Sequence, residues 1–136
     1  MRFTYCPDCG EKLVLKAQEL GLNTCWVGLT HGKSAARVDD DEKLVIVIAL
    51  GYGANQGTAH KSKALAAVSN VTDHLPDWYA RGLEAALLAP TALNQQKFFF
   101  TLQDDTAHVT PDKGAYTMVD LGIVKYHFEA ASGYRM

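Results

Sequence analysis

The sequence lacks the features that mark membrane, secreted and fibrous proteins. Its longest unbroken apolar run covers residues 44–50, whereas a membrane-spanning helix needs about 20 residues. The N-terminal residues contain no apolar signal-peptide core, and three cysteines are an odd number that does not suit a secreted disulfide framework. The four prolines and eleven glycines are ordinary amounts, which excludes collagen-like and low-complexity chains. We therefore expect a reduced, cytoplasmic, globular protein.

The sequence also lacks an excess of charge of one sign. Its 13 basic residues oppose 15 acidic ones, so the formal net charge is -2. Nucleic acids and anionic membranes bind broad basic surfaces, and this balance therefore predicts neither a nucleic-acid nor a membrane partner. By contrast, 48% of the 136 residues are hydrophobic, which predicts a folded chain that buries roughly two-thirds of its unfolded surface.

Helical and strand patterns are mixed along the chain without a regular βαβ repeat, which predicts an α+β fold. The helical patterns cover residues 13–20, 78–88 and 116–132, and a hairpin is predicted for residues 97–102 and 106–110. The apolar run 44–50 has no alternation, which is typical of a central strand covered on both faces. Residues 54–70 are predicted to form a long surface loop.

A Cys-x-x-Cys-Gly pattern, which contains Cys6 and Cys9, dominates residues 1–12. This spacing suits two thiolate ligands of a tetrahedral zinc ion, and Cys25 with His31 could complete a Cys3His site. A redox dithiol is disfavoured because no thioredoxin-like βαβ pattern surrounds the pair. The pattern favours a partial knuckle without a bound ion, and zinc at Cys6 and Cys9 is the alternative.

No motif of a hydrolase or a nucleotidase occurs in the sequence. It contains no Gly-x-Ser-x-Gly elbow, no phosphate-binding loop and no dinucleotide-binding glycine fingerprint. The remaining histidines show no metal-ligand spacing: His60, His74, His108 and His127. The acidic run at residues 39–42 is most simply a solvated loop.

Three segments could contact a ligand, although each also has a purely structural interpretation. Residues 89–96 place uncharged donors and acceptors between a helix and a strand, where they could bind the edge of a planar ligand or simply cap the helix. Residues 23–28 put small polar side chains beside an indole, which could line a flat pocket or pack in the core. Lys61 and Lys63 could bind a phosphate group or belong to a solvated loop.

In this order, the segments resemble the FMN-dependent nitroreductase family. The Ala-Pro-Thr-Ala-Leu-Asn-Gln-Gln-Lys-Phe stretch is similar to that family's Ala-Pro-Ser-x-x-Asn-x-Gln-Pro-Trp segment, with Lys97 at the position of the usual Pro. The other matching segments are residues 20–28, 49–53, 60–63 and the Asp-x-Gly helix 120–128. The Thr-Cys-Trp element precedes the Ala-Pro-Thr element, as in a subfamily of fused half-domains. The resemblance covers roughly residues 17–133.

The resemblance implies an α+β nitroreductase fold and non-covalently bound FMN. It implies hydride transfer through the flavin from NAD(P)H to nitroaromatics, quinones or similar acceptors, with no catalytic protein residue and with a homodimer as the assembly. By position, the residues expected to line the flavin ring are Pro90, Thr91, Ala92, Asn94 and Gln96. Those expected to face the ring from a second element are Thr24, Cys25 and Trp26, and those expected near the phosphate are Lys61 and Lys63.

The family pattern also implies how the chain is organised. Residues 13–136 correspond to a nitroreductase-like domain, and residues 1–12 form a zinc-knuckle-like head in place of the family's first half-domain. We therefore expect the apolar surfaces of residues 44–50 and 116–132 to be covered by a second copy of the chain. The alternative function is a catalytically idle nitroreductase-like fragment or a small zinc-knuckle binding module.

Overall fold

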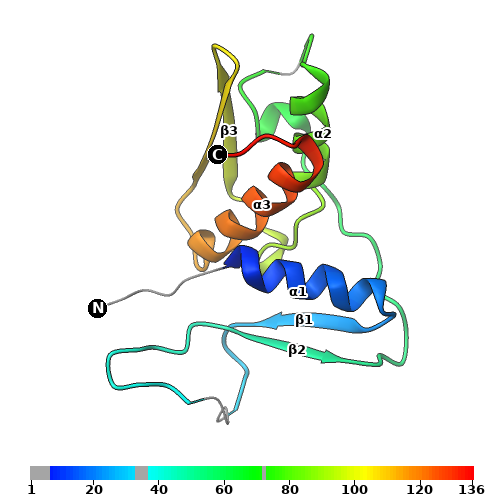
Figure 1. The fold of residues 1–136 in the computed structure, drawn as a ribbon, viewed down its shortest axis with the longest axis vertical. Helices are drawn as coiled ribbons and strands as arrows, with labels where there is room; N and C mark the ends of the chain where they lie inside the picture. The colour runs from blue at the N-terminus through cyan, green and yellow to red at the C-terminus, as the bar shows by residue number, and fades with distance from the viewer. Residues whose placement is uncertain (1–6, 33–36, 72) are drawn as a thin grey trace. The chain divides into compact units, whose positions relative to one another are not determined.

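The computed structural model describes residues 7–32, 37–71 and 73–136, and it divides into two compact units, Met1–Thr58 and Ala59–Met136. Helices and strands are mixed in the chain (Figure 1), and the described strands form two separate two-stranded antiparallel sheets. The predicted α+β class is confirmed.

The described residues of the first unit form one helix and one pair of strands. Helix α1 (Pro7–Glu19) precedes strand β1 (Asn23–Val27), which pairs antiparallel with strand β2 (Val47–Gly51). The helix begins earlier than the predicted residue 13, because Pro7 suits the first helical turn, where an N–H has no helical partner. It is followed, as predicted, by Gly21 in the left-handed conformation, with φ of 77°.

The prediction of a doubly covered central strand at residues 44–50 is wrong. Strand β2 begins only at Val47, and among the described residues it pairs with β1 alone. Ala49 is exposed, and 62% of Leu50 is accessible to solvent. A continuous apolar run predicts a strand, but it does not determine how many neighbours that strand has in its own chain.

Trp26 is the centre of the packing in the first unit. It stands opposite Ile48 in the strand register, and a Cβ atom placed on Gly10 of α1 would collide with its indole ring. Its Nε1 donates a hydrogen bond of 3.3 Å to Oε2 of Glu11, a residue that is only 1% exposed. The strand pair therefore packs against α1 through this indole and through Ile48, whose Cδ1 also lies beside Gly10.

In the part of the second unit that the structure describes, there are two helices, a hairpin and two short 3₁₀ turns. Its elements are η1 (Leu65–Ala67), α2 (Asp77–Ala86), η2 (Ala92–Asn94), β3 (Phe98–Gln103), β4 (Thr106–Pro111) and α3 (Thr117–Ser132). The predicted helices and hairpin are confirmed, with small shifts at their ends. Pro76 precedes α2, and Gly133 ends α3 with φ of 73°.

The core of the second unit lies where α2 and α3 pack together. Gly82 faces the ring of Phe128, and that ring stacks on Phe100 of β3 with 4.8 Å between centroids. Tyr79 meets the same ring edge-on at 5.7 Å, and all three aromatic side chains are fully buried. The small residue on α2 allows the close approach of the two helices.

The prediction that residues 54–70 form a surface loop is wrong for the end of that segment. Val68 is fully buried, and its carbonyl accepts a 2.7 Å hydrogen bond from the N–H of Phe100. The Asn70 side chain completes the pairing, since its Oδ1 accepts from the N–H of Leu102 at 2.9 Å. Residues 68–70 therefore run alongside β3 in the parallel direction.

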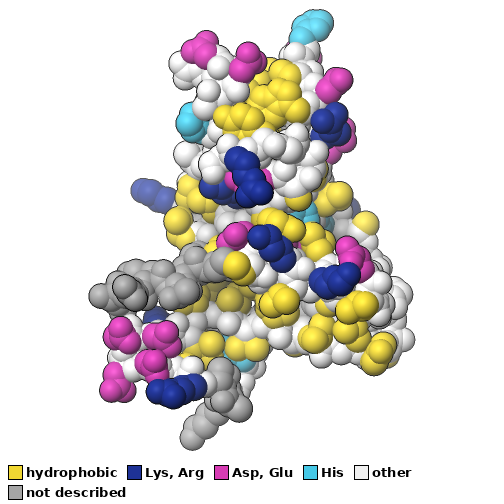
Figure 2. All heavy atoms as spheres, in the orientation of Figure 1, with side chains coloured by type: hydrophobic (Ala, Val, Ile, Leu, Met, Phe, Trp, Pro, Cys, Tyr) yellow, Lys and Arg dark blue, Asp and Glu magenta, His cyan; other side chains and the backbone are white. Residues whose placement is uncertain are grey.

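The surface carries charged and apolar side chains together. Figure 2 shows acidic side chains gathered at the lower left, and the run at residues 39–42 between β1 and β2 is exposed, as predicted. Hydrophobic side chains also reach the surface of the first unit, including Leu13 at 68% and Leu20 at 64% exposure. No helix in the described part of the chain is both long and apolar enough to span a bilayer.

Candidate functional site

Two of the predicted ligand segments meet in the second unit. The carbonyl of Lys61 accepts hydrogen bonds from Asn94 Nδ2 at 3.1 Å and from Gln96 Nε2 at 2.8 Å. Lys63 returns the interaction, since its N–H donates to Gln96 Oε1 at 2.8 Å and its Nζ donates to the Gln96 carbonyl at 2.9 Å. The structure thus brings both predicted lysines together with the two predicted amide residues.

Gln96 is the buried junction between these segments. It is 2% exposed, and its two side-chain N–H groups donate to the carbonyl of Lys61 and to Oδ1 of Asn94. The amide is therefore used within the chain, so that Gln96 fixes the shape of the site. Asn94 is exposed, but both ends of its amide also bond within the chain.

The lysine segment, residues 60–63, is also anchored to the end of α2. His60 Nε2 donates to the Leu87 carbonyl at 2.9 Å, and the Ser62 hydroxyl donates to the same oxygen at 3.1 Å. The last carbonyls of a helix have no N–H partner within the helix, and here the His60 and Ser62 side chains act as the donors to one of them. Lys61 and Lys63 are exposed, so the fixed backbone presents two ammonium groups that can attract an anion.

The loop formed by residues 91–96 has an unusual backbone. Leu93, Asn94 and Gln96 have φ of 53°, 51° and 45°, which is the left-handed region. The loop is closed by Thr91, whose Oγ1 accepts a 3.0 Å hydrogen bond from the N–H of Gln96. This geometry is costly for most residues, so the surrounding structure must impose it.

Asp120 on α3 supplies much of that support. Its Oδ1 accepts from the N–H of Ala92 at 2.9 Å, and its Oδ2 accepts from Gln95 Nε2 at 2.6 Å. Gln95 Nε2 also donates to the carbonyl of Ala115, which ties the loop to the start of α3. Asp120 is only 3% exposed, and this burial raises the pKa of its carboxyl, while the hydrogen bonds from Ala92 and Gln95 act in the opposite direction.

Sequence reasoning did not assign a role to Asp120 or Gln95. Asp120 was noted only as part of a helix that resembles a family motif, and Gln95 only within a polar segment. The signal that could have identified the carboxylate is its position, directly after Val119 on the apolar side of a helix. A charged group at such a position needs a partner inside the protein.

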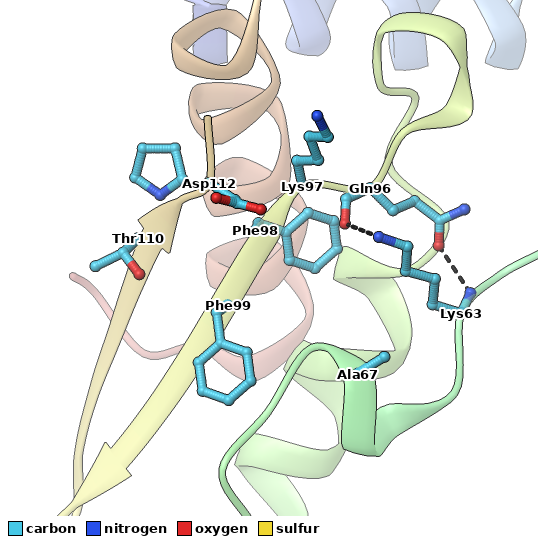
Figure 3. Close-up of a pocket in the computed structure, with 9 residues that line it drawn as sticks. Lys63, Ala67, Gln96, Lys97, Phe98, Phe99, Thr110 and Asp112 are labelled. Atoms are coloured by element: carbon cyan, nitrogen blue, oxygen red, sulfur yellow. Dashed lines mark hydrogen bonds between the residues drawn. The ribbon is translucent and has the colours of Figure 1, made fainter. Parts of the chain in front are cut away.

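A cavity of about 340 Å³ borders the same junction, and Figure 3 shows its walls. Lys63 reaches the Gln96 carbonyl at its edge, and Lys97 extends away to the carbonyl of Lys113 at 2.9 Å. The lining residues are Lys63, Ala67, Gln96, Lys97, Phe98, Phe99, Thr110, Pro111 and Asp112. The walls thus combine aromatic side chains with groups of both charges.

The other predicted flavin contacts lie on β1 of the first unit. Thr24 and Trp26 are partly buried, and the Trp26 indole is engaged with Glu11. Cys25 is exposed and forms no disulfide, and its Sγ donates to the carbonyl of Trp26 at 3.7 Å. Their proposed contact with a ring therefore concerns the first unit, whereas the lysine segment and loop 91–96 belong to the second.

The predicted metal ligands show no assembled site. Cys6 lies outside the described residues, and Cys9, within α1, is disulfide-bonded, whereas a zinc ligand is a thiolate. His31 Nδ1 donates to the carbonyl of Gly32 at 3.1 Å. Within the described ranges, no group of three or more His, Cys, Asp or Glu side chains could hold a metal ion.

Comparison with known proteins agrees with this fold. A solved structure of a "putative nitroreductase" from Thermotoga maritima has a TM-score of 0.72 and 24% sequence identity to this chain. The similarity covers 92% of this chain and 52% of the other, so this chain spans about half the length of that protein. A search of curated proteins found no match. The family model described as "Putative TM nitroreductase" matches residues 6–132, and the chain therefore belongs to that nitroreductase family.

Proposed function

We propose that the protein is an FMN-dependent oxidoreductase that uses NAD(P)H to reduce nitroaromatic, quinone or similar acceptors. The observation that supports this most is the junction at Gln96, where the lysine segment meets loop 91–96. A phosphate-binding element and a ring-binding element have to be adjacent for one FMN molecule to use both. When bound, the flavin supplies the hydride-transfer chemistry, and the protein positions it.

The residues of the second unit fit the two ends of FMN. Lys61 and Lys63 supply positive charge for a phosphate, and their backbone is held in place by Gln96. Thr91 accepts from the N–H of Gln96, so its hydroxyl proton is directed elsewhere and can be donated to a ligand edge. Pro90 and Ala92 flank this hydroxyl with small apolar surfaces for a flat ring.

The proposed flavin contact of the first unit, taken by itself, is the Thr24–Trp26 segment of β1. Because Cys25 is exposed, its side chain is accessible to a ligand, whereas Trp26 is tied to Glu11. We assign the segment a ring-facing role by family position. We further propose that a second copy of the chain completes the assembly as a homodimer.

The test is FMN titration of the purified protein, followed by flavin fluorescence and by NAD(P)H oxidation with a nitroaromatic acceptor. We expect Lys61→Gln to weaken FMN binding about tenfold, since one charged contact to the phosphate is lost while the backbone hydrogen bonds at residue 61 stay. Arg81→Gln is the matched control, because it removes one exposed positive charge from α2 in the same unit.

Two results would contradict the proposal. Equal FMN affinities of Lys61→Gln and Arg81→Gln would remove Lys61 from the site. A wild-type protein that neither binds FMN nor oxidises NAD(P)H would favour the catalytically idle nitroreductase-like fragment instead.

A further inference from the structure

The cavity of about 340 Å³ described above borders the exposed face of the β3–β4 hairpin, and we call it the hairpin cavity. Phe99 of β3 and Thr110 of β4 stand directly opposite each other in the strand register, and both residues are exposed. Phe98 and Phe100 are buried, because successive side chains point to opposite faces of a strand. One wall of the hairpin cavity is therefore the face of the hairpin that the core does not use.

The opposite wall comes from the segment that runs along the other edge of β3. The N–H of Phe100 donates to the carbonyl of Val68, which places the preceding residue, Ala67, beside that strand. Lys63 is fixed by its hydrogen bond to the carbonyl of Gln96 (Figure 3). Hydrogen bonds within the second unit thus hold both walls, and a ligand that enters a preformed cavity loses less entropy than one that has to order it.

The charged residues that line the hairpin cavity have an excess of positive charge. Two ammonium groups, those of Lys63 and Lys97, stand against one carboxylate, that of Asp112. None of the three forms an ion pair with another described residue, since the lysines donate to backbone carbonyls and Asp112 accepts from the N–H of Lys113. An ammonium has three N–H donors, so each lysine retains two for a further partner. The lining therefore favours a ligand with one negative charge.

The hairpin cavity shares little with the residues expected to bind flavin. Only Lys63 and Gln96 belong to both sets, whereas Lys61 and Thr91 do not line the cavity. The side-chain amide of Gln96 is bonded within the chain, to Lys61, Lys63 and Asn94. A ligand in the hairpin cavity and a flavin would therefore use largely different groups of the protein.

We propose that the hairpin cavity is a second ligand site, separate from the flavin site, and that it binds a small aromatic carboxylate. The ring of Phe99 offers an apolar face to the ring of the ligand, and the lysine ammonium groups attract its carboxylate. The hydroxyl of Thr110, which has no hydrogen-bond partner among the described residues, supplies a further donor. An aromatic amine would meet two like charges. The proposal goes beyond the proposed function, because it requires no flavin.

The test is isothermal titration of the full chain, without FMN and at neutral pH, with benzoate and with its neutral analogue benzamide. Asp112→Asn removes the only carboxylate of the lining, while its side-chain oxygen can still accept from the N–H of Lys113. We expect this variant to bind benzoate about three- to tenfold more tightly and benzamide as the wild type does. Asp104→Asn is the matched control, because it removes an exposed carboxylate from the turn of the same hairpin, and it should change neither affinity.

Phe99→Thr tests the contribution of the aromatic ring. It keeps a residue that suits a strand, and we expect the affinities for benzoate and benzamide both to fall about fivefold to tenfold. Thermal unfolding of each variant checks that the hairpin is intact. Because Asp112→Asn compares two probes on one folded protein, its result decides the proposal even if Phe99→Thr does not fold.

Each outcome supports or overturns the second site. Tighter binding of benzoate alone by Asp112→Asn, with Asp104→Asn unchanged, would support it. Absence of saturable benzoate binding by the wild type, or equal effects of the two Asp→Asn changes, would overturn it. Displacement of benzoate by FMN would also overturn it, since the two would then share one site and the proposed function would stand. A protein that binds benzoate but not FMN would refute the proposed function and keep the second site.

Discussion

Asp120 is a single buried carboxylate on which the shape of loop 91–96 depends. Burial raises the pKa of its carboxyl above the ordinary value, although the hydrogen bonds from Ala92 and Gln95 favour the charged form. The folded-state pKa of this acid therefore lies above its unfolded-state pKa. The stability that this group contributes is complete below the ordinary Asp pKa, and it is lost as pH rises through the raised folded value.

We predict that the wild type gains stability relative to Asp120→Asn as pH is lowered from about 7 to about 4. Asparagine does not titrate, so the difference between the two unfolding free energies isolates the carboxyl group of residue 120. Urea unfolding at several pH values measures it. Asp73→Asn provides the comparison for loss of an exposed carboxylate in the same unit. Parallel stability curves for the wild type and Asp120→Asn would refute the assignment.

At the scale of elements, the interface of α2 and α3 depends on the absence of a side chain at Gly82. A Cβ atom there would lie 2.5–2.8 Å from three ring atoms of Phe128. That ring has little room to move, because it stacks on Phe100 and meets Tyr79. The buried positions of α2 recur at helical spacing, and Gly82 is in the middle of that stripe.

We predict that Gly82→Ala lowers the free energy of unfolding by about 1–3 kcal/mol, because the core is overpacked. This range is the net loss, because overpacking outweighs the gain of about 1 kcal/mol that alanine offers over glycine in a helix. The shift of the urea midpoint measures the effect, and the exposed Glu84→Ala on α2 is the control. Adding Phe128→Leu should recover part of the loss. Additive effects of the two changes would argue against direct contact.

The elements that were predictable from sequence have local signals at their ends. Pro76 precedes α2, Gly133 follows α3, and the pair Asp104–Asp105 turns the hairpin with positive φ at both residues. The pairing of residues 68–70 with β3 has no such signal, since its hydrogen bonds go to a strand about thirty residues later.

The site was predictable to a similar extent. Family resemblance selected Asn94 and Gln96, but it could not show that their amides bind the Lys61 carbonyl, because that partner is distant in the sequence and belongs to the backbone. The role of Asp120 depends on a buried contact, and the left-handed backbone of Leu93 is a property of its dihedral angles. Neither quantity is visible in a pattern of residue types.

At the scale of the whole molecule, apolar side chains remain exposed on the first unit. Leu13 belongs to α1, Leu20 directly follows that helix, and Leu50 lies near the end of β2 with 62% exposure. This chain spans about half the length of the family structure compared above, so two copies of the chain together have a similar number of residues to that one protein. The proposed homodimer would remove these surfaces from water.

We predict that the wild type sediments as a dimer. Leu50→Glu should raise the dissociation constant of this dimer by more than about tenfold, because a charge would enter an apolar interface. Analytical ultracentrifugation over a range of protein concentrations measures this. Leu88→Glu, at a similarly exposed leucine of the second unit, is the control. A wild-type protein that stays monomeric at every concentration would show that the exposed leucines have another role.

The anchoring of residues 60–70 has a consequence for the energetics of binding. His60 and Ser62 fasten one end to the last turn of α2, Gln96 fastens the middle, and residues 68–70 are fastened to β3. The backbone that carries Lys61 and Lys63 has therefore lost its conformational freedom during folding. The Lys63 ammonium already donates to the Gln96 carbonyl, so an arriving anion has mainly the Lys61 side chain left to order. Most of the entropic cost of building its site is therefore already met before it binds.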